Sequence, residues 1–135
     1  MLLGMHVRQH KLGRVYSSEA GFVLFPGRET VRVPDVAFVR TDRMPQGEAR
    51  WHFPRLAPDL AVEVLLPTDR DPDVRAKVAM YHEAGVPLVW LVDPRAQTVT
   101  VLARGQEPAA LTGADTLDGG DVLPDLRIEV AEIFA

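Results

Sequence analysis

Three side chains in this sequence combine a reactive type with an unusual setting: Asp35, Glu63 and Lys77. Glu63 lies in the apolar run 60–66, where an ionised carboxylate is costly unless a partner or a metal ion compensates its charge. The plainer alternative is an edge strand on which Glu63 faces water. Asp35 follows Pro34 at the start of a valine-rich stretch, where it could simply cap a strand end. Lys77, taken alone, could be a solvated helix lysine.

Taken together, the two carboxylates and the lysine suit the hydrolysis of a phosphodiester. Asp35 and Glu63 on adjacent strands can hold a hard divalent ion such as Mg²⁺, which prefers oxygen ligands and keeps several waters. A lysine near that ion can orient or deprotonate the attacking water and stabilise the charge that builds on the phosphate. The sequence therefore predicts a catalytic set of Asp35, Glu63 and Lys77.

The scarcity of lysine draws further attention to Lys77. The chain has 13 arginines, only two lysines (Lys11 and Lys77) and no asparagine. Such a bias, which a GC-rich genome would produce, pushes basic positions towards arginine. A lysine that remains is either a chance survivor or is required as lysine.

The segments that carry Glu63 and Lys77 are expected to be a strand and a helix. Residues 60–66 are short, rich in branched side chains and bounded by prolines, which favours a buried central strand. Asp71-Pro72 has the chemistry of an N-cap and first helical residue, and Gly85 ends the helix. Its expected apolar face carries Val74, Val78 and Tyr81.

The rest of the chain is expected to supply more strands than helices. The expected segments are a helix at 2–11, strands within 15–25 and 31–40, a loop at 41–58, strands at 87–93 and 97–103, a loop at 113–120 and a closing segment at 126–134. This order predicts an α/β chain of the α+β type, with a mixed sheet and one main helix.

The composition is that of an ordinary globular protein, with 135 residues, 47% of them hydrophobic and 25% charged. This length predicts one domain over residues 1–135. No apolar run approaches a membrane span, and no secretion signal is evident, so we expect a cytoplasmic protein without a membrane partner. The absence of cysteine excludes disulfides, thiolate zinc sites and a cysteine nucleophile. The net charge of −4 argues weakly against a protein that coats nucleic acid.

An ordered series of motifs resembles the Uma-type restriction endonuclease family of the PD-(D/E)XK nuclease superfamily, from Leu12 onward. The motifs are Val33-Pro34-Asp35-Val36-Ala37-Phe38-Val39, Pro58-Asp59-Leu60-Ala61-Val62-Glu63-Val64-Leu65, Lys77, Tyr81, Gly85-Val86-Pro87, Trp90-Leu91-Val92-Asp93-Pro94, and Asp121-Val122-Leu123 through Ile133-Phe134. The resemblance implies a restriction-endonuclease-like core with Asp35 and Glu63 as metal ligands.

The chain departs from the usual superfamily signature or from the family pattern in three places. Leu65, two residues after Glu63 and on the same face of the strand, stands where the superfamily usually has lysine. Such families look as though this lysine has moved to the following helix, where Lys77 lies. Leu66 replaces a usual serine. Relatives also carry a longer N-terminal region with a helix and a further acid, so we expect the N-terminal helix to be truncated.

Pro58-Asp59 matches the first two residues of the superfamily motif, but Asp59 is the weaker candidate for sharing an ion with Glu63. Four residues along one strand separate their Cα atoms by roughly 13 Å, which is too far for two short carboxylates to share an ion. Asp35 is therefore the better candidate.

Other polar residues are weaker candidates for a site. His52 and His82 lack a second histidine at metal-ligand spacing. A set of arginines flanks the loop before the strand that carries Glu63 and is either a phosphate-contacting surface or simply solvated. The set consists of Arg40, Arg43, Arg50 and Arg55.

These observations predict a DNA endonuclease that depends on Mg²⁺ or Mn²⁺. A truncated helix would leave an apolar face exposed, so a homodimer is expected as well. The alternative function is a catalytically inert scaffold or binding module that keeps the nuclease fold. Binding of Mn²⁺ at Asp35 and Glu63 distinguishes the two.

Overall fold

The computed structural model describes residues 2–17, 21–25, 31–44 and 56–135. Its helices are α1 (Leu2–His10), the 3-10 turn η1 (Thr41–Arg43), α2 (Asp71–Glu83) and α3 (Val130–Ile133). Its strands are β1 (Gly13–Ser17), β2 (Phe22–Val23), β3 (Val31–Arg32), β4 (Val36–Arg40), β5 (Leu60–Val64), β6 (Leu88–Asp93), β7 (Thr98–Ala103), β8 (Ala109–Leu111), β9 (Thr116–Gly119) and β10 (Leu123–Glu129).

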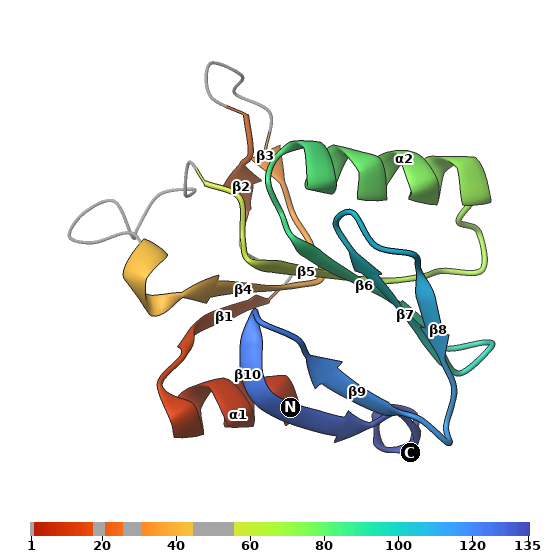
Figure 1. Ribbon diagram of the computed structural model, residues 1–135. Coiled ribbons are helices and arrows are strands. Elements are labelled where there is room, and N and C mark those ends of the chain that lie inside the picture. Colours follow the sequence, from red (N-terminus) through yellow and green to blue (C-terminus); the bar gives the residue numbers. More distant parts are fainter. Residues whose placement is uncertain (1, 18–20, 26–30, 45–55) are drawn as a thin grey trace.

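A six-stranded sheet with the order β1-β4-β5-β6-β7-β8 forms the centre of the molecule. β5 and β6 are parallel, whereas the other neighbours in this sheet are antiparallel. Parallel strands need a crossover connection, and α2 provides it. In Figure 1, α2 lies along one face of the sheet, and α1 lies on the other side with β9 and β10. The mixed sheet and the single main helix are confirmed.

The two faces of the sheet form two apolar cores because alternate strand residues point to opposite sides. The core beneath α2, here called the α2-side core, is built from Phe22, Leu24, Ala37, Val39, Ala57, Ala61, Val78, Tyr81, Val86 and Val89. The opposite core contains, among others, Leu3, Val7, Phe38, Leu60, Val62, Leu88, Trp90, Val99, Leu117, Leu123 and Val130. By the same alternation, Glu63 points to the α2 side.

Helix α2 starts one residue earlier than the sequence suggested. Arg70, not Asp71, is the N-cap residue, and its side chain makes no capping hydrogen bond. Asp71 and Pro72 are the first two helical residues, and the carboxylate of Asp71 still interacts favourably with the positive end of the helix dipole. Gly85 ends the helix as expected, with a φ of 102° that glycine adopts without steric cost.

Two segments differ from the predicted elements. The stretch 31–40 contains two strands that belong to different sheets, because Pro34 between them has no N–H to donate to a ladder. The predicted loop at 113–120 contains β9, which pairs with β10. Only Leu117 and Gly119 of β9 are buried, so its sequence shows little of the hydrophobic pattern typical of a strand.

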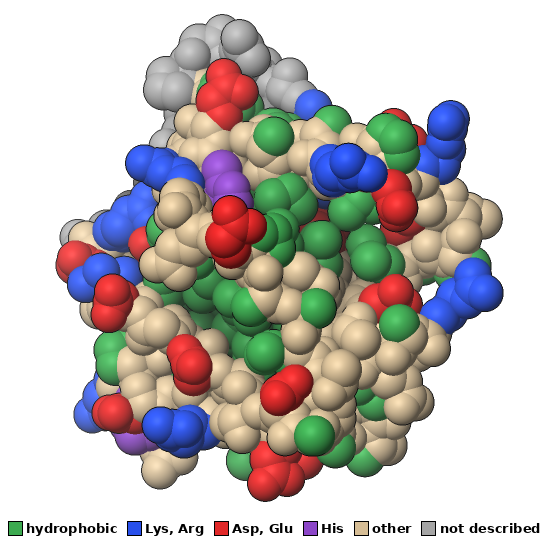
Figure 2. Space-filling model, turned by 45° about the vertical axis from the view of Figure 1, so that its right-hand side comes forward, with side chains coloured by type: hydrophobic (Ala, Val, Ile, Leu, Met, Phe, Trp, Pro, Cys, Tyr) green, Lys and Arg blue, Asp and Glu red, His purple; other side chains and the backbone are tan. Residues whose placement is uncertain are grey.

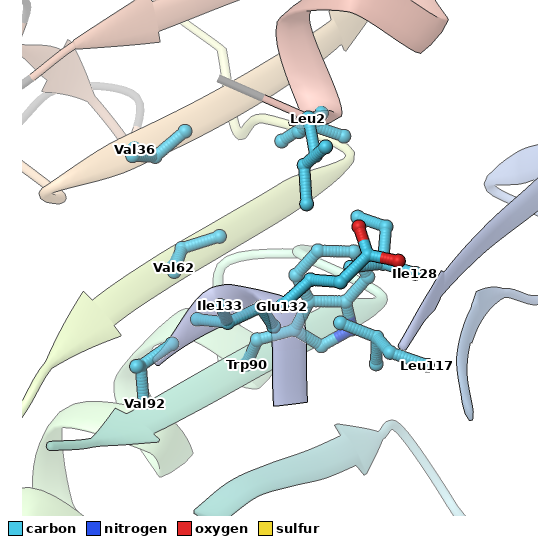
Figure 3. Close-up of a pocket in the computed structure, with 10 residues that line it drawn as sticks. Leu2, Val36, Val62, Trp90, Val92, Leu117, Ile128, Glu132 and Ile133 are labelled. Carbon is cyan, nitrogen blue, oxygen red and sulfur yellow. The ribbon is translucent and has the colours of Figure 1, made fainter. Parts of the chain in front are cut away.

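An apolar hollow of about 330 Å³ opens on the face opposite α2. Most of its lining side chains are hydrophobic, and Figure 3 shows how they surround it: Leu2, Leu3, Val36, Val62, Trp90, Val92, Leu117, Ile128, Glu132 and Ile133. The indole Nε1 of Trp90 is buried and has no hydrogen-bond partner among the described residues. Figure 2 likewise shows hydrophobic side chains gathered in a depression of the surface.

No helix in the described part of the chain is long and apolar enough to cross a membrane.

Candidate active site

Asp35 and Glu63 stand opposite each other on neighbouring segments of the sheet. Val36 pairs with Val62 in the antiparallel ladder of β4 and β5, so Asp35, one residue earlier, faces Glu63, one residue later. Both side chains lie on the α2 side by strand alternation. The Oδ2 atom of Asp35 accepts a hydrogen bond of 2.7 Å from the N–H of Val64, which fixes the carboxylate next to Glu63.

Helix α2 supplies two partners for the Glu63 carboxylate. The hydroxyl of Tyr81 donates a hydrogen bond of 2.6 Å to Oε1 of Glu63. The Nζ atom of Lys77 lies 3.7 Å from Oε2. Lys77 and Tyr81 are four residues apart, so they lie on one face of the helix. Each oxygen of Glu63 therefore has its own partner on α2.

The environment of Glu63 disfavours its negative charge. Only 8% of the residue is exposed, and burial is the main reason that its pKa lies above the usual value. The hydrogen bond from Tyr81 and the charge of Lys77 lower the pKa, but the neighbouring Asp35 raises it again. Burial, followed by the hydrogen bond to Glu63, also raises the pKa of Tyr81, so this phenol stays a donor. The fold thus holds two like charges close together in a poorly solvated place.

A cleft of about 500 Å³ opens over these residues between the sheet and α2. Its ionisable lining residues are mostly acidic: Asp35, Glu63, Asp69, Asp73 and Lys77. One oxygen of Asp69 accepts a hydrogen bond of 2.7 Å from the N–H of Leu66, which ties this acid to its own loop. The excess of negative charge makes the cleft attractive to a cation.

The donor set of the cleft fits a divalent ion that prefers oxygen. Asp35 and Glu63 offer carboxylate oxygens, and their charges are only partly compensated by Lys77. No group of three or more histidine or acidic side chains among the described residues is arranged to hold a metal ion. Two carboxylates, with the remaining positions left to water, match the preference of Mg²⁺ rather than that of zinc.

The structure brings Asp35, Glu63 and Lys77 into one cleft, as the sequence suggested. Leu65 also lines the cleft, where the superfamily motif would place its lysine, and Lys77 reaches Glu63 from the helix instead. Tyr81 was expected as part of the apolar helix face and of the family motif series, but its contact with Glu63 was not predicted. The sequence did offer one sign of this contact: Tyr81 lies four residues after Lys77 and therefore on the same face of the helix.

Asp59 has a different role from Glu63, although it immediately precedes the same strand, β5. Its carboxylate accepts 2.7 and 2.8 Å hydrogen bonds from the side chain of Arg43 and the N–H of Arg40. Arg43 also donates to the carbonyl oxygen of Ala57. Asp59 thus fastens η1 to the start of β5, at the far end of β4 from Asp35.

The remaining candidates lie away from the cleft or outside the described residues. His82 contacts the carbonyl oxygen of Leu102 through Nε2 at 3.0 Å, which is a structural contact between α2 and β7. Arg40 lies 3.6 Å from Asp42, and Arg43 is held by Asp59. Neither arginine lines the cleft. The other candidates lie outside the described residues: His52, Arg50 and Arg55.

Comparison with known proteins identifies the fold and the family of this chain. A search among curated proteins found no match. The structure is similar to a "putative nuclease belonging to DUF820" from Anabaena variabilis, with a TM-score of 0.83 and 22% sequence identity. The match covers 98% of this chain and 74% of that one and establishes the fold. The family model Uma2, described as "Putative restriction endonuclease", matches residues 1–131. The chain therefore belongs to the Uma2 family of restriction-endonuclease-like proteins.

Proposed function

We propose that this protein is a DNA endonuclease that hydrolyses phosphodiester bonds with Mg²⁺ or Mn²⁺. The observation that carries the proposal is the pairing of Asp35 with Glu63, each fixed by a separate hydrogen bond, beside the ammonium group of Lys77. Membership of the Uma2 family supports the same reaction class and a DNA substrate.

Asp35 and Glu63 would hold the cation through their carboxylate oxygens. When bound, a divalent ion supplies Lewis-acid activation of the phosphate and of a water molecule. Lys77 would position the attacking water and donate N–H groups to the phosphate oxygens as negative charge builds on them. Its side chain is 52% exposed, so it can reach a substrate that enters from solvent.

The decisive experiment combines cleavage with metal binding. Plasmid DNA is incubated with the full chain in Mg²⁺, Mn²⁺ or EDTA, and Mn²⁺ binding is measured by calorimetry. We expect metal-dependent nicking, and we expect Asp35→Asn and Glu63→Gln to abolish both nicking and Mn²⁺ binding. Glutamine is isosteric with glutamate but carries no charge for the ion.

The exposed acids Asp121 and Glu83 provide matched controls, because Asp121→Asn and Glu83→Gln remove a charge outside the cleft. Undiminished cleavage by Glu63→Gln contradicts the assignment of this residue. A wild-type chain that binds no Mn²⁺ and cuts no DNA would instead be an inert scaffold.

We also propose that two copies associate through the apolar hollow. Leu2, at its rim, is 39% exposed, and an apolar concavity of this kind tends to recruit a partner surface. A homodimer would bury Leu2 and leave the α2-side cleft of each copy open to DNA.

A further inference from the structure

We propose that Tyr81 selects the metal ion by occupying one oxygen of Glu63, so that the site favours Mg²⁺ and Mn²⁺ over Ca²⁺. This inference rests on the proposed function, because it assumes that Glu63 is a ligand. The Tyr81 hydroxyl is 2.6 Å from Oε1 of Glu63 and engages that oxygen alone. The other oxygen, Oε2, is left for a cation and for Lys77.

The fold keeps the Tyr81 hydroxyl in place. Tyr81 is only 1% exposed, and its ring is packed in the α2-side core with Val78, Val86 and Val89. Its carbonyl oxygen accepts a 2.9 Å hydrogen bond from the N–H of Val86, so the backbone at the end of α2 is fixed as well. The ring cannot swing away from Glu63 without opening this core.

A carboxylate oxygen that accepts a hydrogen bond from a fixed donor is a poorer ligand, so an ion binds more readily through the other oxygen. Mg²⁺ accepts this arrangement, since it demands near-octahedral geometry and keeps several waters. Ca²⁺ takes about six to eight oxygen ligands and often binds a carboxylate through both oxygens. The hydrogen bond from Tyr81 opposes that two-oxygen mode. Tyr81 is accordingly a positioning residue that acts on the ion through Glu63.

Tyr81→Phe tests this role, because phenylalanine keeps the ring in the core and removes only the hydroxyl. Dissociation constants for Mg²⁺, Mn²⁺ and Ca²⁺ are measured by calorimetry in the wild-type chain and the variant. We expect the preference for Mg²⁺ over Ca²⁺ to fall by about fivefold or more, the factor that one net hydrogen bond represents. The ratio of two affinities in one protein does not depend on its folded fraction.

Tyr16→Phe is the matched control, since Tyr16 lies on β1 and contacts Phe22 and Arg14 instead of the cleft. We expect it to leave the ion preference unchanged. An unchanged preference in Tyr81→Phe would overturn the selection role, and metal-dependent cleavage by the wild type would still uphold the proposed function. A wild-type chain that binds none of the three ions would overturn both.

Discussion

The carboxylate of Asp35 accepts a hydrogen bond from the N–H of Val64, the residue that follows Glu63, at a distance of 2.7 Å. The spacing of the two acids is therefore set by the backbone of β5 and by the register of β4, not by flexible side chains. Because the backbone enforces this approach, the acids cannot relax apart to reduce their repulsion. That rigidity is the property that a preformed cation site needs.

The first prediction concerns the stability cost of Glu63. Its pKa is raised in the folded protein above the value of 4.5 expected for the unfolded chain, mainly by burial. The folded state therefore binds the proton more tightly, and stability is lost as the pH rises through the folded pKa. In EDTA, Glu63→Gln should be more stable than the wild type at pH 7 and above, and this advantage should vanish near pH 4.5 and below.

Urea unfolding from pH 4 to pH 8 measures this difference, with Glu83→Gln at the exposed end of α2 as the reference. A stability advantage of Glu63→Gln that does not change with pH would contradict the prediction. So would a wild type that gains stability relative to the variant as the pH rises.

The second prediction concerns Lys77. Lysine and arginine are both charged and both favour helices, so Lys77→Arg should be silent if the residue is only solvated. If Lys77 serves the reaction, arginine should fail, because its guanidinium is larger, planar and unable to give up its proton. We expect the cleavage rate to fall at least about tenfold, or about 1.4 kcal/mol of transition-state stabilisation.

Lys11→Arg is the natural control, because Lys11 is the other lysine of the chain and lies outside the cleft. Both variants are assayed with the same DNA and the same metal ion. Equal rates for wild type and Lys77→Arg would remove Lys77 from the catalytic set.

The third prediction separates a structural acid from the site. Asp59 is 6% exposed and accepts hydrogen bonds from Arg40 and Arg43. Asp59→Asn should lower the free energy of unfolding by about 1.5–3 kcal/mol, the range for a hydrogen bond to a charged group. Mn²⁺ affinity of the folded variant should be unchanged, since Asp59 does not line the cleft.

Asp42→Asn provides the comparison, because Asp42 forms an exposed ion pair with Arg40. Exposed pairs contribute less than about 1 kcal/mol, so this variant should be nearly as stable as the wild type. If the fully folded Asp59→Asn variant bound Mn²⁺ more weakly than the wild type, Asp59 would belong to the site after all.

The fourth prediction concerns association through the apolar hollow. Sedimentation equilibrium should detect a dimer of the wild type, and Leu2→Glu should weaken it by placing a charge at the rim of the hollow. Met5→Glu changes an exposed residue of the same helix that does not line the hollow, so it should have less effect. A wild type that remains monomeric at high concentration would count against association.

The sequence revealed Glu63 because a single acid interrupts an otherwise apolar strand, and such an interruption is visible without coordinates. The pairing with Asp35 came from the resemblance to the family, because the register between two strands cannot be read from either strand alone. Tyr81 was harder to recognise, because a tyrosine at a buried helix position looks like a packing residue until its hydroxyl is located. The strand β9 was missed because its pattern of burial is carried by Leu117 and Gly119 alone.

The residues of the site come from two separate parts of the chain. Metal binding is therefore linked to the folding of the molecule. Glu63 and Tyr81 are 18 residues apart within the unit formed by β5, α2 and β6, which also carries Lys77. Asp35, which immediately precedes β4 and lies 29 residues before Val64, joins them only when β4 pairs with β5. An ion held by both acids would therefore stabilise the folded chain, by about 2.7 kcal/mol at a hundredfold excess over its Kd. Thermal unfolding with and without Mg²⁺ would thus report occupancy of the site in the absence of any DNA.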